Sequence, residues 1–477
     1  MRCGGGPAGA EDAVKLWYSG ALPHEKSAGR SGLQGLHGAA GVALNTEPKT
    51  TLVRAIGRWS LTALMVNTVI GASIFGTPSL IAARLGSYSP LAYLIAGAGI
   101  AVIAACMSEV ASQFSETGGP YLYSRAAFGQ FVGIQIGWLT WLSRIGATSA
   151  AANLFIIYLS QFFPGATGRA ARMLVMTALI GVLAIVNIRG VAAGNWLSNA
   201  FTLTKLLMLF LFIAAGFAAL AWKPSVRVIP PTPTTAMTDW FDAVLLLVYG
   251  YGGFEAALFV TGELRNPRKD APFALLTALT SVALIYTAIQ FVVIHTLPNA
   301  AATGRPIADS TRQFLGPVGG ALIAGGIVVS LYGYLSANML HTPRLTFALG
   351  ERGDFPSAFA AIHRRFQTPY FSILVFAVIS LAFSVGGNFR WNATVSAVAR
   401  LFTYGATALA LPVMRRKRPE ADAFRLPAGM MFTVLGLLFT GVLVTRMSRS
   451  ELIVVVATFL LALLNWLWAR RRPAEAK

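Results

Sequence analysis

Charge is scarce in this chain. Only 12% of its 477 residues are charged, 55% are hydrophobic, and 18 Asp and Glu stand against 38 Lys and Arg. A composition this apolar excludes a soluble protein and indicates an integral membrane protein. The net charge of +20 does not indicate a nucleic-acid partner, because the basic residues concentrate in loops between apolar segments, as membrane topology predicts. The expected surroundings are therefore a lipid bilayer.

Cysteines are also few, and three common catalytic motifs are absent from the sequence. The two cysteines are Cys3, near the N-terminus, and Cys106, inside an apolar segment, so neither a disulfide framework nor a cysteine-based metal site is expected. The chain has no His-Glu-x-x-His helix, no Gly-x-Ser-x-Gly elbow and no pair of deep aspartates. We therefore expect no enzyme activity, no cofactor and no bound metal.

The first 50 residues lack helical periodicity. They are rich in Gly, Ala and charge, which predicts a mobile cytoplasmic tail at 1–50. They also lack the continuous apolar core of a signal peptide. The first apolar segment is therefore expected to serve as an uncleaved insertion signal.

Long apolar runs, by contrast, are plentiful. Windows of the length needed to cross a bilayer predict twelve transmembrane helices, at about 59–84, 89–112, 131–163, 171–188, 194–222, 240–262, 273–297, 317–341, 370–386, 393–414, 430–446 and 451–470. Well over half of the 38 Lys and Arg residues fall in segments that are cytoplasmic if both termini are inside. This asymmetry predicts an all-α protein of the cytoplasmic membrane with both termini in the cytoplasm, including a short C-terminal tail at 471–477. The internal loop at 342–369 is expected to carry a short amphipathic helix.

The first apolar segment is interrupted at its centre. Val69-Ile-Gly-Ala-Ser-Ile-Phe-Gly76 places Gly71, Ala72 and Ser73, and then a second glycine, where a regular membrane helix is expected. These residues lower helix propensity at a depth where unpaired backbone cannot face lipid, so an interruption there must line a protein-enclosed cavity. The alternative is that the small residues only allow close approach of a neighbouring helix.

A second segment of the same kind favours the first interpretation. Tyr249-Gly-Tyr-Gly-Gly-Phe-Glu255 lies in the middle of the sixth apolar segment. Gly-interrupted segments at matching places in two halves of a chain indicate the binding site of a transporter. The sequence therefore predicts two broken helices that together bind a small ligand near the bilayer midplane.

Four motifs, in order, resemble those of the amino acid-polyamine-organocation permeases. They are the run from Ile70 to Gly76, Ser115-Glu-Thr-Gly-Gly-Pro-Tyr-Leu-Tyr123, the Tyr249 segment followed by Gly262-Glu-Leu-Arg-Asn-Pro267, and Pro343-Arg-Leu-Thr-Phe-Ala-Leu-Gly-Glu-Arg-Gly-Asp-Phe-Pro356. The resemblance implies a LeuT-like fold at 55–418, with two inverted five-helix repeats and broken helices 1 and 6, plus peripheral helices at 430–470. It also implies secondary transport of amino acids or related amines. Some relatives depend on a disulfide-linked subunit, but the predicted external loops hold no cysteine, so we expect no such partner.

The resemblance assigns substrate binding to backbone groups. The amides of Ala72 and Ser73, next to Gly71, are expected to hold the substrate carboxylate, and the carbonyls of Val69 and of 249–252 the ammonium. This places Tyr249, Gly250 and Gly252 in the site. Tyr249 matches a family position that often holds an aromatic gate above the substrate. The alternative interpretation is that its ring only packs against helix 10. Many relatives have Gly where this chain has Ser73, so the hydroxymethyl group either narrows the pocket or adds a hydrogen bond.

Lys205 is the most informative charged residue. It lies about eleven residues into an apolar helix, too deep for its stem to reach the interface easily, and an ionisable residue at such depth is functional by default. It matches the family's fifth-helix lysine, which puts an ammonium near where sodium-coupled relatives hold a cation. A lysine removed from water can release its proton near neutral pH. We therefore expect coupling to protons, or no coupling ion, and no need for sodium.

Glu255 is the second expected coupling residue, and its role is open. It follows the sixth-helix break, where it either relays a proton or contacts a polar substrate, or else forms a buried structural pair, with Arg144 as the suggested partner. Glu109 and Arg400 are expected nearer their helix ends, in structural pairs.

These features predict an amino acid permease that is proton-coupled or exchanging and independent of sodium. Neutral amino acids are favoured, because no acidic cluster beyond Glu255 lies in the cavity segments. Two other functions stay open: an amino-acid-binding receptor or scaffold without turnover, and an antiporter of cationic amino acids or polyamines.

Overall fold

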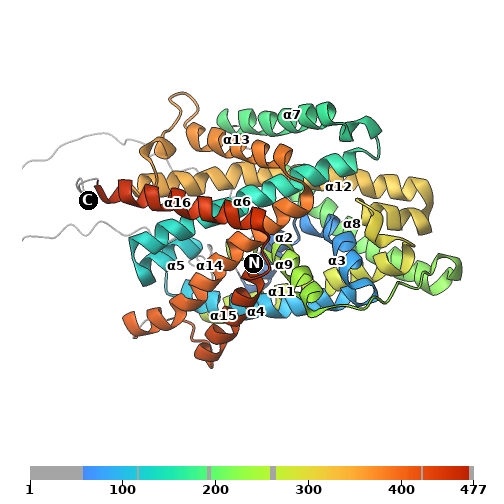
Figure 1. The fold of residues 1–477 in the computed structure, drawn as a ribbon, viewed down its shortest axis with the longest axis horizontal. Helices are drawn as coiled ribbons and strands as arrows, with labels where there is room; N and C mark the ends of the chain where they lie inside the picture. Colours follow the sequence, from blue (N-terminus) through green and yellow to red (C-terminus); the bar gives the residue numbers. More distant parts are fainter. Residues whose placement is uncertain (1–56, 115–117, 191–194, 258–264, 420–422, 472–477) are drawn as a thin grey trace, which may run out of the picture.

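The computed structural model describes residues 57–471 except 115–117, 191–194, 258–264 and 420–422. The expected N-terminal tail at 1–50 and all but the first residue of the expected C-terminal tail lie outside the described residues. Within the described ranges the chain is all-helical (Figure 1).

The α-helices follow the apolar windows of the sequence. In chain order they are α2 (Arg58–Val69), α3 (Thr77–Leu85), α4 (Ser89–Ala111), α5 (Gly119–Phe128), α6 (Gln130–Leu159), α7 (Arg169–Ile188), α8 (Asn195–Trp222), α9 (Met237–Tyr251), α10 (Phe254–Ala257), α11 (Pro267–Thr296), α12 (Pro306–Glu351), α13 (Tyr370–Gly386), α14 (Phe389–Lys417), α15 (Gly429–Val444) and α16 (Arg449–Arg471). The first window contains two helices, α2 and α3, and the sixth contains α9 and α10. The remainder of the sixth window, up to 262, lies mostly outside the described residues.

Eight helical segments in the described part of the chain are long and apolar enough to cross a membrane. They involve α4, α6, α7, α8, α11, α12, α14 and α16, and α13 and α15 are shorter apolar helices. Such helices satisfy their own backbone hydrogen bonds, which the hydrocarbon interior of a bilayer requires. The chain is therefore a multi-pass membrane protein.

The centre of the bundle is the contact between α6 and α14, which pack along much of their length. Small residues permit this contact: a Cβ added at Gly146 would lie 2.8 Å from the carbonyl oxygen of Asn392. The Ser396 hydroxyl donates to the carbonyl of Ser143 at 2.7 Å across the same interface. Close approach of small residues and hydrogen bonds between helices are the usual means by which membrane helices associate.

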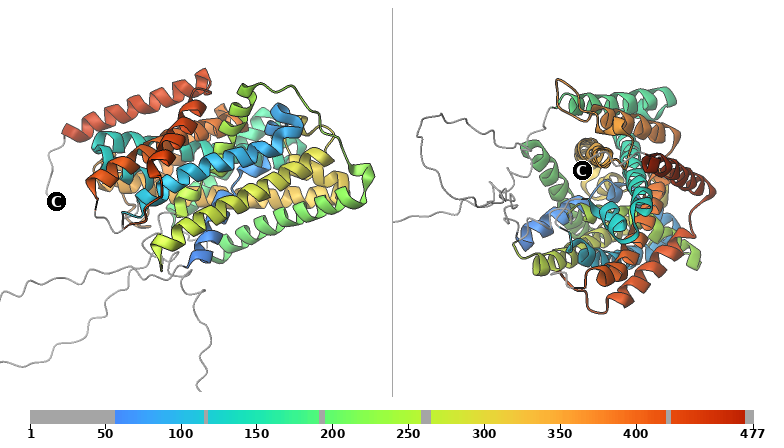
Figure 2. Two further views of the ribbon diagram at one scale, coloured as in Figure 1. Left: turned by 90° about the horizontal axis from the view of Figure 1, so that it is seen from below. Right: turned by 90° about the vertical axis from the view of Figure 1, so that its left-hand side faces the viewer.

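The edge of the bundle exposes apolar side chains. In α7, Leu174 is 71% exposed, and in α8 Phe210 is 68% exposed, as expected of surfaces that face lipid tails. Figure 2 shows α7 and α16 at the periphery when the bundle is viewed from its end, and α16 packs against α6 and α14.

Two connections differ from the sequence-based expectation. Helix α12 does not end at 341 but continues to Glu351, so the loop expected at 342–369 is shorter and holds only the 3₁₀ helix Ser357–Ala360. The loop was expected because the apolar window ends at 341, whereas Pro343, a residue that usually disfavours a helix interior, lies inside α12. Helix α5, after the second membrane segment, was not expected.

Gly253, between α9 and α10, marks the place where the second broken helix meets the first. Its φ is +116°, a conformation that favours glycine, and a Cβ there would lie 2.5 Å from the carbonyl oxygen of Thr68 in α2. The break in α9 therefore packs directly on the backbone of α2.

Replacing Gly253 by Ala should destabilise the protein by about 1–3 kcal/mol, because the side chain meets both an unfavourable φ and a fixed carbonyl. Thermal unfolding of the purified protein in detergent measures the effect. Gly441→Ala in α15 is the matched control, since nothing lies within 4 Å of a Cβ there. Equal melting temperatures for the two variants would show that the backbones do not meet at Gly253.

Candidate functional site

The first broken helix loses its hydrogen bonding where the sequence predicted. Residues 70–72 are bends between α2 and the 3₁₀ helix Ser73–Phe75, and Ile70 has ψ of 80°. The amide of Ile70 still donates to the carbonyl of Val66 at 2.9 Å, but the amides of Ala72 and Ser73 donate to no backbone carbonyl within the described residues. Successive amides of this kind attract an anion such as a carboxylate.

The second broken helix changes direction at Gly252, which has extended backbone with φ −68° and ψ 152°. The break lies against the first one: the Ser73 hydroxyl donates to the carbonyl of Gly250 at 3.4 Å. Of the predicted substrate-binding residues, Val69, Ala72, Ser73, Tyr249 and Gly250 are buried, and Gly71 and Gly252 are half-buried. The structure thus brings the two interrupted segments together in the interior of the bundle.

A residue that the sequence did not single out bridges the two breaks. The Tyr286 hydroxyl, from α11, lies 3.0 Å from the carbonyl oxygen of Val69 and 3.3 Å from that of Gly250. These are two of the carbonyls expected to bind a substrate ammonium. A lone tyrosine in an apolar helix gives no sequence signal of such a role, because the helix face that meets the breaks is set by tertiary packing.

Tyr249 shows features of both interpretations given to it. Its ring packs edge-on against Phe389 of α14, with ring centroids 6.2 Å apart, which is the predicted contact with the tenth membrane segment. Its buried hydroxyl has no hydrogen-bond partner among the described residues. A buried donor without a partner is costly, which fits a hydroxyl that faces a ligand position. The gate stays a prediction.

Lys205 of α8 binds the end of α2. Its ammonium nitrogen lies 2.9 Å from the backbone oxygen of Asn67, 2.8 Å from the side-chain Oδ1 of the same residue and 2.6 Å from the carbonyl oxygen of Ile70. Those carbonyls lose their helical partners where α2 stops. A protonated amine has three N–H donors, one for each of these oxygens, whereas a neutral amine has two.

Glu255 lies in a cluster of charges just after the second break. Its carboxylate is 2.9 Å from the guanidinium of Arg400 and 3.4 Å from that of Arg144, and it accepts from the amide of Gly253 at 2.8 Å. The pair with Arg144 is the one suggested from the sequence. The expectation that Arg400 lies nearer its helix end was wrong, because α14 begins at Phe389 and Arg400 sits well inside it, with its side chain 3% exposed.

Glycine makes this cluster possible. A Cβ at Gly252 would lie 1.6 Å from an Nη of Arg400, so only a residue without a side chain lets the guanidinium reach Glu255. Glu109, the other buried acid expected in a structural pair, forms one with Arg415 at 2.6 Å. Both acids therefore meet arginine inside the bundle.

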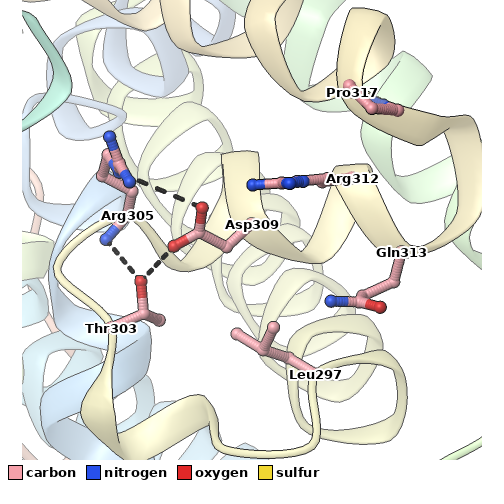
Figure 3. Close-up of a pocket in the computed structure, with 7 residues that line it drawn as sticks. All are labelled: Leu297, Thr303, Arg305, Asp309, Arg312, Gln313 and Pro317. Carbon is pink, nitrogen blue, oxygen red and sulfur yellow. Dashed lines mark hydrogen bonds and ion pairs between the residues drawn. The ribbon is translucent and has the colours of Figure 1, made fainter. Parts of the chain in front are cut away.

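A separate pocket of about 620 Å³ opens at the connection between α11 and α12 (Figure 3). It is lined by Leu297, Thr303, Arg305, Asp309, Arg312, Gln313 and Pro317. The Thr303 hydroxyl donates to the Asp309 carboxylate, and Arg305 lies 3.9 Å from that carboxylate. Several of the lining residues belong to α12, which is kinked at Gly316, but none belongs to α2, α3, α9 or α10, so this pocket is distinct from the predicted site.

Comparison with known proteins connects this geometry to a family. The model of the family described as "Amino acid permease" matches residues 56–464. The serine/threonine exchanger SteT of Bacillus subtilis (strain 168) is 26% identical over 401 residues, 81% of this chain and 89% of the exchanger. The branched-chain amino acid permease BcaP of the same organism is 23% identical over 451 residues, 90% of this chain and 96% of the permease. Its methylthioribose transporter is 26% identical over 397 residues, 79% and 85% of the two chains.

A solved structure resembles the fold. Mhp1, a nucleobase-cation-symport-1 family transporter in a closed conformation with bromovinylhydantoin bound, aligns with a TM-score of 0.55 at 16% identity, over 90% of this chain and 97% of Mhp1. At this identity the match shows the LeuT-like fold and nothing of the substrate.

Glu255→Gln should destabilise the protein by about 3–5 kcal/mol, because it leaves Arg400 and Arg144 buried without their acid. Arg400→Gln should have a similar effect. The destabilisation of the double variant should be smaller, by about 1–3 kcal/mol, than the sum of the two single destabilisations. Thermal unfolding of the purified variants measures both quantities. Asp309→Asn, in a more exposed pair, is the control and should cost less than about 1 kcal/mol. A Glu255→Gln variant with unchanged stability but altered pH dependence of transport would instead favour the proton relay.

Proposed function

This chain belongs to the amino acid permease family, and we propose that it carries neutral amino acids by proton-coupled or exchange transport without sodium. Family membership makes it an amino acid transporter rather than an enzyme. The contacts of Lys205 at the end of α2 are the observation that carries the proposed independence from sodium.

The proposed architecture has twelve membrane crossings. The eight long segments and the shorter helices α13 and α15 supply ten of them, and the two broken helices, α2 with α3 and α9 with α10, supply the others. Helices α2 to α8 and α9 to α14 are then the two five-helix repeats of 55–418. Helices α15 and α16 are the peripheral pair of 430–470. Each repeat begins with a broken helix, which supports the division.

The proposed cytoplasmic end is the one that holds α5 and the C-terminal ends of α12, α14 and α16, on the left in Figure 1. Asp354, just after α12, accepts from Gln130 at 2.8 Å, and its backbone oxygen accepts from Asn465 of α16 at 2.6 Å. The last turn of α14 at the same end carries Arg415, Arg416 and Lys417. Basic residues mark the cytoplasmic side of membrane proteins, so we place both termini inside the cell and the protein in the cell membrane.

The proposed binding mode uses peptide groups for the part shared by all amino acids. The amides of Ala72 and Ser73 hold the carboxylate, and the carbonyls of Val69 and Gly250 hold the ammonium. These groups come from the two breaks, which lie in contact in the low-dielectric interior, where opposite partners for both substrate charges are required. The substrate side chain would then be recognised elsewhere, beside the Tyr249 gate.

Coupling is proposed to occur at Lys205. Only the protonated amine can donate to all three oxygens at the end of α2, so a change of protonation changes how firmly α8 holds α2. The ammonium also places a fixed positive charge where an alkali cation would otherwise be needed. Both effects support transport that responds to protons and not to sodium.

Neutral substrates are favoured by the state of Glu255. Its carboxylate is already matched by Arg400 and Arg144, so it offers no unpaired negative charge to a cationic side chain. This observation counts against the antiporter of cationic amino acids or polyamines. Counterflow of a bound compound is the measurement that distinguishes a transporter from a receptor without turnover.

A thermal-shift screen against the twenty amino acids, common polyamines and methylthioribose tests the substrate class, because a ligand stabilises the state that binds it. We expect stabilisation by neutral amino acids and counterflow of the same compounds in proteoliposomes. Stabilisation by lysine, arginine or polyamines alone would contradict the proposed class. Binding without counterflow would identify a receptor.

Lys205→Ala should lower the initial rate of uptake by about tenfold or more, because it removes charge-assisted hydrogen bonds from α2. It should also abolish any stimulation by an inward proton gradient. Uptake into proteoliposomes at several external pH values measures both effects, and replacing sodium by choline should not matter. Lys223→Ala is the control, because Lys223 also donates to a carbonyl, that of Phe314, but at the exposed end of α8. Sodium-dependent uptake that ignores pH would refute this form of coupling.

A further inference from the structure

The two carbonyls assigned to the substrate ammonium each already have two donors within hydrogen-bond distance. The Val69 oxygen accepts from the amide of Gly71 at 2.7 Å and from the Tyr286 hydroxyl at 3.0 Å. The Gly250 oxygen accepts from the Ser73 hydroxyl at 3.4 Å and from the same Tyr286 hydroxyl at 3.3 Å. A carbonyl oxygen has two lone pairs, so two donors already lie at each atom, and the single hydrogen of Tyr286 points at one of the two oxygens at a time.

An ammonium can therefore reach both carbonyls only by displacing a donor that the two share. The Gly71 amide is part of the chain of the break and cannot leave without refolding it. The Tyr286 hydroxyl is the only donor common to both oxygens within the described residues, and it belongs to another helix, α11. It is also the weaker competitor, since a phenol has one hydrogen for two acceptors and an ammonium has three.

We propose that the Tyr286 hydroxyl substitutes for the substrate ammonium, holding the two breaks together when the carrier crosses the membrane without substrate. This inference rests on the proposed function. A carrier that completes net transport must return without its substrate, and closing the site with unpaired carbonyls in the bilayer interior is costly. With the hydroxyl as a built-in donor, the return step proceeds. An exchanger crosses loaded in both directions and does not need it.

The packing of Tyr286 suits this role. The residue is 1% exposed, and its ring lies among two other tyrosines, with centroids 6.0 Å from Tyr93 and 5.6 Å from Tyr251. The contact with Tyr93 is edge-on and that with Tyr251 is tilted, and such aromatic contacts hold a ring without using its hydroxyl. The Tyr251 hydroxyl is engaged elsewhere, with the backbone oxygen of Tyr93 at 2.7 Å, so it does not compete for the breaks. The hydroxyl of Tyr286 is thus held at the two carbonyls by its ring.

Tyr286→Phe tests the proposal, because it removes the hydroxyl and keeps the ring. Two rates are measured in the same proteoliposomes with labelled L-serine and L-leucine: net uptake into vesicles without internal amino acid, and exchange into vesicles preloaded with the unlabelled compound. The ratio of net uptake to exchange should fall at least tenfold relative to the unsubstituted protein. An equal loss of both rates, or no loss, would overturn the proposal, as would an unsubstituted protein that shows exchange without net uptake.

Tyr251→Phe is the matched control. It removes a buried tyrosine hydroxyl of the same cluster that donates to a carbonyl outside the two breaks. Any effect on stability should lower net uptake and exchange together and leave their ratio unchanged. A change in the ratio as large as that of Tyr286→Phe would show that the effect is one of general packing.

Two further measurements keep the outcome decisive. If Tyr286→Phe does not fold, Ser73→Ala removes the other hydroxyl from the Gly250 oxygen. This variant must lower the same ratio of net uptake to exchange, though by less, and an unchanged ratio rejects the proposal.

Hydrogen exchange of the peptides over 66–76 and 247–257 needs no substrate. Tyr286→Phe must speed hydrogen exchange in these peptides, whereas Tyr251→Phe must not. If no amino acid is transported, the proposed function fails, and hydrogen exchange still decides whether Tyr286 holds the breaks.

Discussion

Peptide groups released from a helix inside a bilayer must find partners in the protein, and this requirement organises the centre of the molecule. Lys205 from α8 and Tyr286 from α11 donate hydrogen bonds to carbonyl oxygens at the end of α2. The break after α9 is met by Ser73 and by the carboxylate of Glu255, which accepts from the Gly253 amide. Broken helices are therefore a property of the surrounding bundle, because separate helices supply the donors and acceptors that an unbroken helix would supply to itself.

The two buried charged groups near the breaks differ in how easily their charge can change. Glu255 meets two arginines, so neutralising it would leave both guanidinium groups without their acid in the interior. Lys205 has no ion pair within the described residues and meets only neutral oxygens. Loss of its proton costs hydrogen bonds but strands no opposite charge. Under the proposed function, this contrast separates a charge that holds the second break in place from one suited to titration during transport.

The sequence predicts the breaks well because glycine and small residues act locally. Gly71 to Ser73 and Gly250 to Gly253 interrupt apolar runs, and the helices end there. The ninth segment was placed at 370–386, which is α13. Contacts between distant segments were harder to predict. Tyr286 has no local signal, and Arg400 was placed near a helix end because the window began at 393, whereas Phe389 begins α14. Which side chain faces a break depends on the register and rotation of packed helices, which a single sequence does not specify.

Under the proposed function, the proton and the substrate act on neighbouring atoms of one short element. Lys205 holds the oxygens of Asn67 and Ile70, and Tyr286 holds the oxygen of Val69 between them. A change of protonation alters the first contact, and arrival of an ammonium alters the second, so both events change how the last turn of α2 is tied to its neighbours. Two ligands that bias the same element are coupled, and the coupling is reciprocal. The spacing of these three carbonyls therefore links proton and substrate without any direct contact between Lys205 and the amino acid.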